Sequence, residues 1–453
     1  MYFLYSLVTA VAAVVLTPYV LVNGVRRKKY LPNLKERLAL RFPPGLSAAG
    51  RSASPTIWLH AVSVGEVLAG VPFARCLKQR FPRLRLVVST TTGTGQKLAG
   101  ERMNFADAVF YFPFDWNGPV RRAFAAVRPD AIVILETEIW PNLLRHARKA
   151  GVPVIFANGR LSDRSFHGFT RAIKTSGGVL RGFLQRVLND AEVYLVQSEQ
   201  DGSRLIALGA EANRVVVTGS MKYDMPRPVP NRFVDWLQIE LDRSRRRPVV
   251  IAGSLSAGEE KPVFEAFRSI QQQWPQALLV MAPRKPERFA AAAESVAQEG
   301  WLPIRRSEIA LDGLSAGILD DAAKSSRGVL LLDTIGELAA AYRLADVVFI
   351  GGSLEPIGGH NPLEPAVCGK VPVFGPSMEN FRDIAARLLE AGAAIQVDSS
   401  AQLSAAWVKL LEDDATRAQM GATAEAIVER NRGATAATLD HVQTLIERQR
   451  APL

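Results

Sequence analysis

Short apolar runs alternate with amphipathic stretches along most of the chain. The alternation occupies residues 56–217 and restarts at residue 249. Buried strands that alternate with helices are typical of a parallel sheet covered on both faces. The predicted strands are 56–59, 86–89, 108–112, 131–135, 152–157, 193–196 and 215–217 in the first half, and 249–252, 278–281, 329–332, 347–350 and 371–374 in the second.

The two halves are joined by a proline-rich stretch. The chain has 453 residues, more than one core commonly accommodates, so two domains are expected. Three prolines lie within 225–230, and a basic run ends at Pro248. We therefore predict Rossmann-like domains over 26–228 and 248–453, joined by a hinge at 229–247. The fold class is then α/β, with both domains facing a central cleft at the carboxyl ends of their strands.

The first 25 residues carry no charge and are almost continuously apolar. About 20 such residues in a helix can cross a bilayer. Four basic residues follow at 26–29, which by the positive-inside rule places the rest of the chain in the cytoplasm. A cleaved signal peptide fits poorly, because its basic residues precede the apolar run. We predict a membrane anchor over 1–25, and Pro18 leaves both a full span and a partial insertion open.

The formal net charge of +11 predicts an anionic partner. Seven basic residues and one acidic residue lie within 26–41, and anionic phospholipid would hold this segment by about 1 kcal/mol per basic residue. The cysteines, Cys76 and Cys368, and the five scattered histidines form neither a disulfide framework nor a metal-binding motif. No metal or other cofactor is expected.

Charged residues follow several predicted strands of the first half. Glu66 opens a helix where a general base would be placed, although a carboxylate there can equally complement the helix dipole. Glu136 and Glu138 follow the strand 131–135, and on extended backbone they would point to opposite sides, so only one should face the cleft. They could also simply mark the start of the next helix. Lys222 is a candidate cation beside the reaction centre or a solvated lysine.

In the second half, positive charge and glycine follow the strands. Arg284 and Lys285 at a helix start suit a phosphate. The glycine-rich stretch 351–359 permits backbone amides to approach a ligand closely. His360 is a candidate phosphate donor or a helix cap, and Glu364 could accept hydrogen bonds from a ribose diol.

Seven blocks, in this order, resemble the 3-deoxy-D-manno-octulosonic acid (Kdo) transferase family of GT-B glycosyltransferases: HAVSVGE, ETEIWPN, NGRLSDRS, TGSMKYD, APRKPERF, DTIGEL and GGSLEPIGGHNPLEP. The resemblance implies that Glu66 is the general base and that Glu136 and Lys222 stabilise the transition state. It assigns no individual role within 158–162 or 252–260. The residues implied to hold the CMP moiety of the donor are Pro283, Arg284, Ile335, Gly336, Glu337, Asn361, Pro362, Leu363 and Glu364.

The implied reaction is an inverting, metal-independent transfer of Kdo from CMP-Kdo to a lipid A precursor in lipopolysaccharide biosynthesis. It implies an enzyme anchored to the bacterial inner membrane on the cytoplasmic side, in contact with anionic phospholipid and not with nucleic acid. Two alternatives remain at this point. A GT-B-fold sugar-nucleotide epimerase would not need an anchor, and a non-catalytic membrane tether would leave the ordered motifs unexplained.

Overall fold

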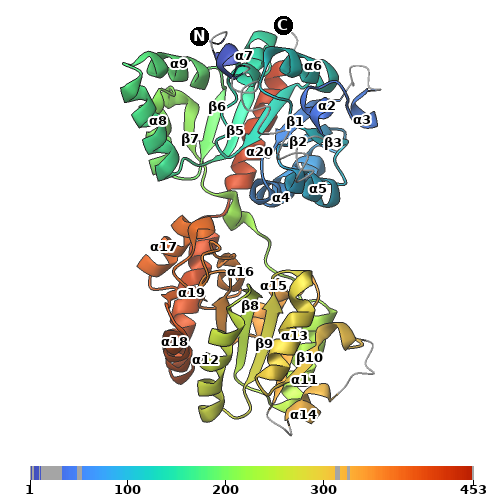
Figure 1. Ribbon diagram of the computed structural model, residues 1–453, viewed down its shortest axis with the longest axis vertical. Helices are drawn as coiled ribbons and strands as arrows, with labels where there is room; N and C mark the ends of the chain where they lie inside the picture. Colours follow the sequence, from blue (N-terminus) through green and yellow to red (C-terminus); the bar gives the residue numbers. More distant parts are fainter. Residues whose placement is uncertain are drawn as a thin grey trace. The chain divides into compact units, whose positions relative to one another are not determined.

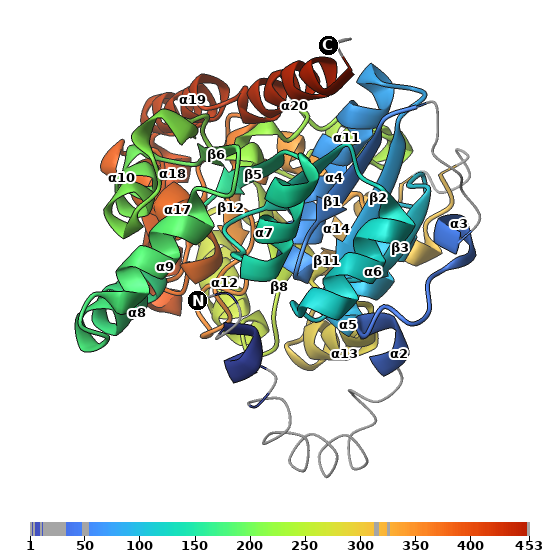
Figure 2. The same cartoon turned by 90° about the horizontal axis from the view of Figure 1, so that it is seen from above.

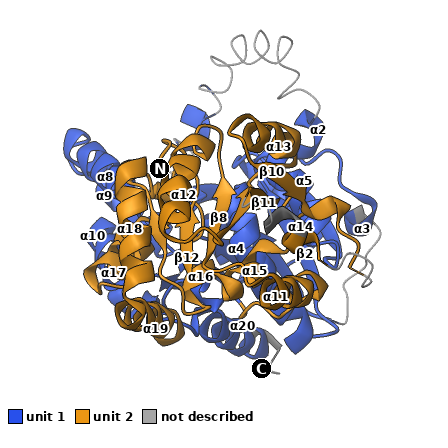
Figure 3. Ribbon diagram, turned by 90° about the horizontal axis from the view of Figure 1, so that it is seen from below, with its two compact units in different colours: residues 1–225, 431–453 blue, residues 226–430 orange. Residues whose placement is uncertain are grey.

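The chain forms two compact α/β units in the computed structural model (Figure 3). Unit 1 comprises Met1–Met225 and Asn431–Leu453, and unit 2 comprises Pro226–Arg430. The two parallel-sheet units confirm the α/β class and the two Rossmann-like domains of the expected fold. The residues that the structure describes are 2, 5–9, 11, 33–47, 54–311, 317–323 and 327–450.

Unit 1 contains a seven-stranded parallel sheet with helices on both faces (Figure 1). Its strands are β1 (Thr56–His60), β2 (Arg85–Thr90), β3 (Ala108–Tyr111), β4 (Ala131–Leu135), β5 (Val154–Gly159), β6 (Val193–Val196) and β7 (Val215–Val217). They lie in the order β3-β2-β1-β4-β5-β6-β7. After β1 the chain adds β2 and β3 on one side of that strand, and it then returns to place β4 on the other side. Doubly wound sheets bind ligands at such a switch point.

Side chains of unit 1 alternate between two cores, one on each face of the sheet. Trp58 of β1 packs on one face against Phe124, whereas its neighbours Ile57 and Leu59 pack on the other face with Phe73. The helices that cover the faces are α2 (Leu34–Arg37), α3 (Pro44–Ser47), α4 (Val64–Arg80), α5 (Gly93–Arg102), α6 (Asn117–Val127), α7 (Pro141–Ala150), α8 (Asp163–Thr175), α9 (Val179–Leu188), α10 (Glu199–Leu208) and α20 (Ala434–Arg450), with the 3-10 turns η1 (Ala212–Arg214) and η2 (Met221–Asp224).

The last helix, α20, belongs to unit 1, although we expected residues 248–453 to form the second domain. Figures 1 and 2 draw it in red among the blue and green elements of unit 1. Leu439, Val442 and Ile446 insert into the core beneath α4, β4 and β5. The physical reason is that the sheet of unit 1 leaves an apolar surface that this helix buries.

The expected anchor over 1–25 lies mostly outside the described residues, which include 2, 5–9 and 11 of it. Tyr2 is buried in the core of unit 1, where its ring meets Phe183 edge-on at a centroid distance of 5.4 Å and its hydroxyl bonds to Asp190. Ser6 accepts a hydrogen bond of 3.0 Å from the Asn142 side chain. Within the described part of the chain, we find no helix whose length and apolar character would suffice for a membrane span.

Unit 2 contains a second seven-stranded parallel sheet, in the order β10-β11-β9-β8-β12-β13-β14. Its strands are β8 (Val249–Leu255), β9 (Leu278–Pro283), β10 (Leu302–Arg305), β11 (Gly328–Leu331), β12 (Val347–Ile350), β13 (Val373–Phe374) and β14 (Ile395–Gln396). Here β8 and β12 flank the switch point. The strand ends that carry APRKPERF, DTIGEL and the glycine-rich block therefore lie at the same edge of the sheet, on β9, β11 and β12.

The expected hinge at 229–247 contains a helix of unit 2, α11 (Arg232–Ser244). Phe233, Leu237 and Leu241 follow one another at four-residue spacing and are buried, so this segment has the apolar stripe of a packed helix. The other helical elements of unit 2 are α12 (Glu260–Gln273), η3 (Pro286–Arg288), α13 (Phe289–Gln298), η4 (Arg306–Glu308), α14 (Ile318–Ala323), α15 (Leu338–Ala341), η5 (Tyr342–Leu344), α16 (Leu363–Ala366), η6 (Glu379–Phe381), α17 (Arg382–Glu390), α18 (Ser400–Glu412) and α19 (Asp414–Arg430).

Candidate active site

Glu66 lies in the first turn of α4, the helix that follows β1 at the switch point of unit 1. Ser63 caps the helix by accepting from the Glu66 backbone N–H at 3.4 Å, and its hydroxyl donates to Glu66 Oε1 at 2.8 Å. The backbone N–H of Val62 donates to Oε2 at 2.6 Å. The carboxylate is therefore held in one orientation, and only 5% of the residue is exposed.

Burial raises the pKa of Glu66 to about 7, and the hydrogen bonds from Val62 and Ser63 oppose the rise. The charges of Glu136 and Glu138 raise this pKa further. A carboxylate with a pKa near 7 can accept a proton at neutral pH, as a general base must. Glu66 thus supports the start of its helix, and the raised pKa favours the predicted role of general base, which stays a prediction.

Glu136 follows β4, the direct neighbour of β1. Its backbone is left-handed, with φ of 58°, and its N–H donates to Ala157 O at 2.9 Å. Such a conformation costs a non-glycine residue about 1–3 kcal/mol and is common at functional sites. We expected Glu136 and Glu138 to point to opposite sides, as on extended backbone. The left-handed turn breaks that alternation, and both carboxylates act on Glu66.

Lys222 lies in η2, and Asn158 ties this turn to the sheet. Asn158 is 2% exposed, and its Oδ1 accepts from the Met221 N–H at 3.0 Å. It too has left-handed backbone, with φ of 58°, at the carboxyl end of β5. On the other side of Lys222, Asp224 accepts from the backbone N–H of Gly433, which precedes α20. The sequence analysis gave Asn158 no role, and in the structure its side chain supports the turn that carries Lys222.

Replacing Asn158 by alanine is expected to weaken the fold and to slow catalysis. The substitution removes the acceptor of a buried N–H and places alanine at positive φ, so we expect a loss of about 1–3 kcal/mol in the free energy of unfolding. Displacement of the Lys222 turn should lower kcat, by up to about 10²-fold. The control is Asn189→Ala, which removes the acceptor of the Glu211 N–H at 3.0 Å, an exposed bond at the C-terminal end of α9. Equal losses of kcat in the two variants, measured below their unfolding temperatures, would contradict the positioning role.

In unit 2, Arg284 follows β9, and its charge acts on His360 and Glu364 at the end of the glycine-rich block. Its backbone N–H donates to Leu255 O of β8 at 2.9 Å, and its side chain is exposed. Burial lowers the pKa of His360 to about 4, and the charge of Arg284 lowers it further. Burial raises the pKa of Glu364, which Arg284 and a hydrogen bond from Asn361 oppose. The structure therefore brings together Arg284, His360, Asn361 and Glu364, as the sequence predicted for one site.

The glycine-rich loop folds back on itself through its own backbone. The Gly359 N–H donates to Gly352 O at 2.7 Å, and the His360 N–H donates to Gly351 O at 3.2 Å. A Cβ at Gly352, whose φ is 69°, would lie 2.8 Å from the His360 ring, so this approach requires glycine. His360 Nε2 is buried and has no hydrogen-bond partner among the described residues. A neutral imidazole has one ring nitrogen that can accept a hydrogen bond.

The DTIGEL turn follows β11, the neighbour of β9. Glu337 is paired with Arg306 at 2.8 Å, and this ion pair holds the turn rather than facing solvent. Ile335 is 61% exposed at the tip, and Gly336 has φ of 96°. An exposed apolar side chain beside a glycine is suited to pack against a flat ring. The contact of Glu337 with CMP stays a prediction, since its carboxylate already has a partner.

Comparison with known proteins finds relatives whose sequences match nearly the whole chain. Residues 32–225 match the family described as 3-deoxy-D-manno-octulosonic-acid transferase (kdotransferase). A 3-deoxy-D-manno-octulosonic acid transferase of Haemophilus influenzae is 32% identical, over 92% of this chain and 93% of its own. The transferase of the same name from Bordetella pertussis is 34% identical, over 88% of this chain and 89% of its own.

Solved structures of lower identity share the fold. The UDP-GlcNAc 2-epimerase of Neisseria meningitidis bound to UDP-GlcNAc superimposes with a TM-score of 0.52 at 11% identity, over 86% of this chain and 100% of its own. The glycotransferase of kitacinnamycin superimposes with a TM-score of 0.51 at 16% identity, over 87% of this chain and 100% of its own. An isomerase and a transferase thus share this architecture, so the fold by itself does not decide between those activities.

Proposed function

Because the chain belongs to the family of 3-deoxy-D-manno-octulosonic acid (Kdo) transferases, we propose that it transfers Kdo from CMP-Kdo to a lipid A precursor in lipopolysaccharide biosynthesis. It is a glycosyltransferase. The observation that carries this conclusion is the identity of 32–34% with transferases of that name over about nine tenths of each chain.

We propose an inverting displacement with Glu66 as the general base. Glu66 takes the proton of the acceptor hydroxyl while that oxygen forms a bond to the anomeric C2 of Kdo. The bond between C2 and the CMP phosphate oxygen breaks, and CMP leaves with the electron pair. The pKa of about 7 and the fixed orientation of the carboxylate support this role. General-base catalysis of this kind contributes about 10²–10⁴-fold.

The leaving phosphate gains negative charge as the bond to C2 breaks, and cations must stabilise it. We propose Arg284 for the phosphate in the bound donor, and Lys222 with Glu136 for the transition state. Asn361 and the adjoining Pro362 and Leu363 would hold the nucleotide, with Glu364 at the ribose. We propose that the nucleobase of CMP is held by the backbone of Pro283 and by the turn Ile335, Gly336 and Glu337. The clustering of Arg284, His360 and Glu364 within electrostatic reach supports this assignment.

The reaction is expected to run without a metal ion. The cations of the protein itself, Arg284 and Lys222, would take the place of a bound divalent ion beside the phosphate. CMP release by the purified enzyme, with CMP-Kdo and a lipid A precursor in detergent, should be unchanged by excess EDTA. Activity that disappears with EDTA and returns with Mg²⁺ would contradict metal independence.

The same preparation distinguishes the two alternative functions. An epimerase would convert UDP-GlcNAc to its C2 epimer without an acceptor, which proton exchange at C2 in deuterated water reports. A non-catalytic tether would release no CMP from CMP-Kdo. We expect CMP release that depends on the acceptor and no exchange in UDP-GlcNAc.

We further propose that the enzyme works at the cytoplasmic face of the inner membrane, where an acylated acceptor is found. The apolar segment 1–25 and the basic residues at 26–29 support this location. Within the described part of that segment, the exposed side chains of Leu7, Val8 and Val11 form an apolar face. Binding to anionic phospholipid would raise the local concentration of the acceptor around the enzyme.

A further inference from the structure

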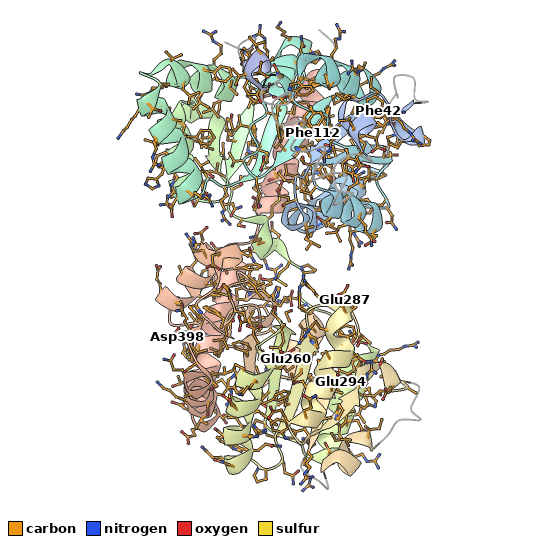
Figure 4. The ribbon with its side chains drawn as sticks, viewed as in Figure 1. Phe42, Phe112, Glu260, Glu287, Glu294 and Asp398 are labelled. Carbon is orange, nitrogen blue, oxygen red and sulfur yellow. The ribbon has the colours of Figure 1, made fainter. Side chains whose placement is uncertain are left out.

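A carboxylate in unit 2 is completely buried and surrounded by backbone amides. Glu259 lies in the turn between β8 and α12, directly before Glu260, which Figure 4 labels, and none of its surface is exposed. Its Oε2 accepts from the N–H of Gly352 at 2.6 Å and of Ser256 at 2.8 Å. Its Oε1 accepts from the N–H of Ser353 at 2.9 Å and of Leu354 at 3.0 Å.

Three of these four donors belong to the turn that follows β12. Glu259 therefore joins the ends of the two strands that flank the switch point of unit 2. A buried carboxylate is stable only when its lone pairs are satisfied, and four N–H groups satisfy it. Conversely, consecutive N–H groups that all point toward one place form an anion-binding concavity, which in this protein is filled by the carboxylate of Glu259.

Two backbone hydrogen bonds connect this turn to the candidate donor site. Gly352 O accepts from the Gly359 N–H, and Gly351 O accepts from the His360 N–H. The His360 ring also packs directly over Gly352. On the other side of the turn, the Ser353 hydroxyl accepts from the Gly375 N–H at 2.7 Å. A shift of residues 351–354 must therefore move His360, and with it Asn361.

We propose that Glu259 is a positioning residue for the sugar nucleotide. Its carboxylate fixes residues 351–354 and so places His360 and Asn361 for the anionic CMP moiety of the donor. This inference rests on the proposed function, because it takes the CMP moiety as the ligand of this loop. It gives a role to the block 252–260, for which the motif pattern provided none.

A second buried carboxylate of the same unit provides the matched control. Glu240 is 1% exposed and accepts from the N–H of Gly317 at 2.8 Å and of Leu319 at 3.2 Å. It joins α11 to the start of α14, segments that precede β8 and β11 in the chain. Like Glu259, it is a buried carboxylate that accepts from backbone N–H groups, here two instead of four, and neither of these belongs to the glycine-rich loop.

The experiment compares Glu259→Gln with Glu240→Gln in the full chain. Glutamine keeps the size of the side chain but places an NH₂ group against two backbone donors, so the turn at 351–354 should loosen. We expect Glu259→Gln to raise the Kd of CMP, measured by calorimetry, and the KM of CMP-Kdo by about 10-fold to 100-fold. Glu240→Gln should lower the unfolding temperature and leave both constants within about twofold of wild type.

The outcomes distinguish a failure of the proposed donor site from a failure of the positioning role of Glu259. A wild-type protein that does not bind CMP overturns the proposed donor site and this inference with it. A wild type that binds CMP, beside a Glu259→Gln variant with the same Kd, overturns the positioning role alone. Equal rises of KM in Glu259→Gln and Glu240→Gln also overturn it, because they would reflect loss of stability. If Glu259→Gln does not fold, Glu259→Asp decides by the same comparison, since it keeps the charge and withdraws it from the turn.

Discussion

Replacing Glu66 by glutamine is expected to lower kcat for Kdo transfer by about 10²–10⁴-fold. Glutamine has nearly the same shape, and its amide oxygen and NH₂ can still meet the Val62 N–H and the Ser63 hydroxyl, which bond to the carboxylate now. The variant should therefore fold and bind CMP with wild-type affinity. It lacks only the basic oxygen, so the loss should appear in kcat. Steady-state kinetics and CMP calorimetry on both proteins measure this difference.

The same carboxylate should govern the pH dependence of the enzyme. A general base works in its ionised form, so kcat/KM of the wild type should rise with pH through a midpoint near the Glu66 pKa of about 7. The folded protein holds the proton of Glu66 more tightly than the unfolded chain, whose pKa is near 4.5. Glu66 therefore costs stability progressively as pH rises from about 4.5 to about 7. The glutamine variant should gain thermal stability over wild type at pH 8 and not at pH 4.5.

Ser63→Ala is the control for damage to the helix start. It removes the cap of α4, at a cost of about 1 kcal/mol, and leaves the carboxylate of Glu66 in place. Most of kcat should remain, and the midpoint of the pH profile should rise, because the Ser63 hydroxyl lowers the pKa of Glu66. A Ser63→Ala enzyme as inactive as Glu66→Gln would mean that the turn, and not the base, carries the effect.

Replacing Lys222 by methionine should have the next largest effect, a fall in kcat of about 10²–10³-fold with little change in the KM of CMP-Kdo. The ammonium group would act on charge that develops only as CMP leaves, so its loss should raise the barrier without weakening donor binding. Methionine keeps an unbranched apolar side chain. The hydrogen bonds that Asn158 and Asp224 accept from backbone N–H groups hold the turn and do not involve the Lys222 ammonium.

The matched control for Lys222 is Lys174→Met on the exposed surface of α8. It removes the same charge from unit 1 and should leave kcat within about twofold, because an exposed charge at a distance is screened by salt. A loss that appears in KM rather than in kcat would place Lys222 in donor binding. Equal, small effects in both lysine variants would remove Lys222 from the catalytic set.

The pattern of apolar residues predicted the two sheets well because buried parallel strands are apolar on both faces. The run 131–135 was predicted as a strand and is β4 with the same bounds. The short edge strands β10 and β14 were missed, because their sequences are partly polar and half exposed. Sequence periodicity also does not state which sheet a helix covers. For that reason α20 was assigned to the wrong unit. The packed helix α11 was taken for a hinge because prolines precede it and a basic run that ends in proline follows it.

For the site, the residue types after the strands were informative, but their supporting contacts were not visible. Glu66 and Arg284 stand out as charges at strand ends. Asn158 and Glu259 act through hydrogen bonds to backbone groups 63 and about 93–95 residues away, and such bonds leave no local pattern. One signal was available for both: each is a polar residue in the stretch that directly follows a predicted strand.

The most direct test of the central claim is the mass of the lipid product. Purified wild-type protein, incubated with CMP-Kdo and a lipid A precursor, should convert the precursor to a species heavier by one or more Kdo residues. The Glu66→Gln protein, at equal concentration and over the same time, should leave the precursor almost entirely unmodified. A precursor mass that does not change with wild-type protein would contradict the transferase function. Equal conversion by both proteins would contradict the mechanism built on Glu66.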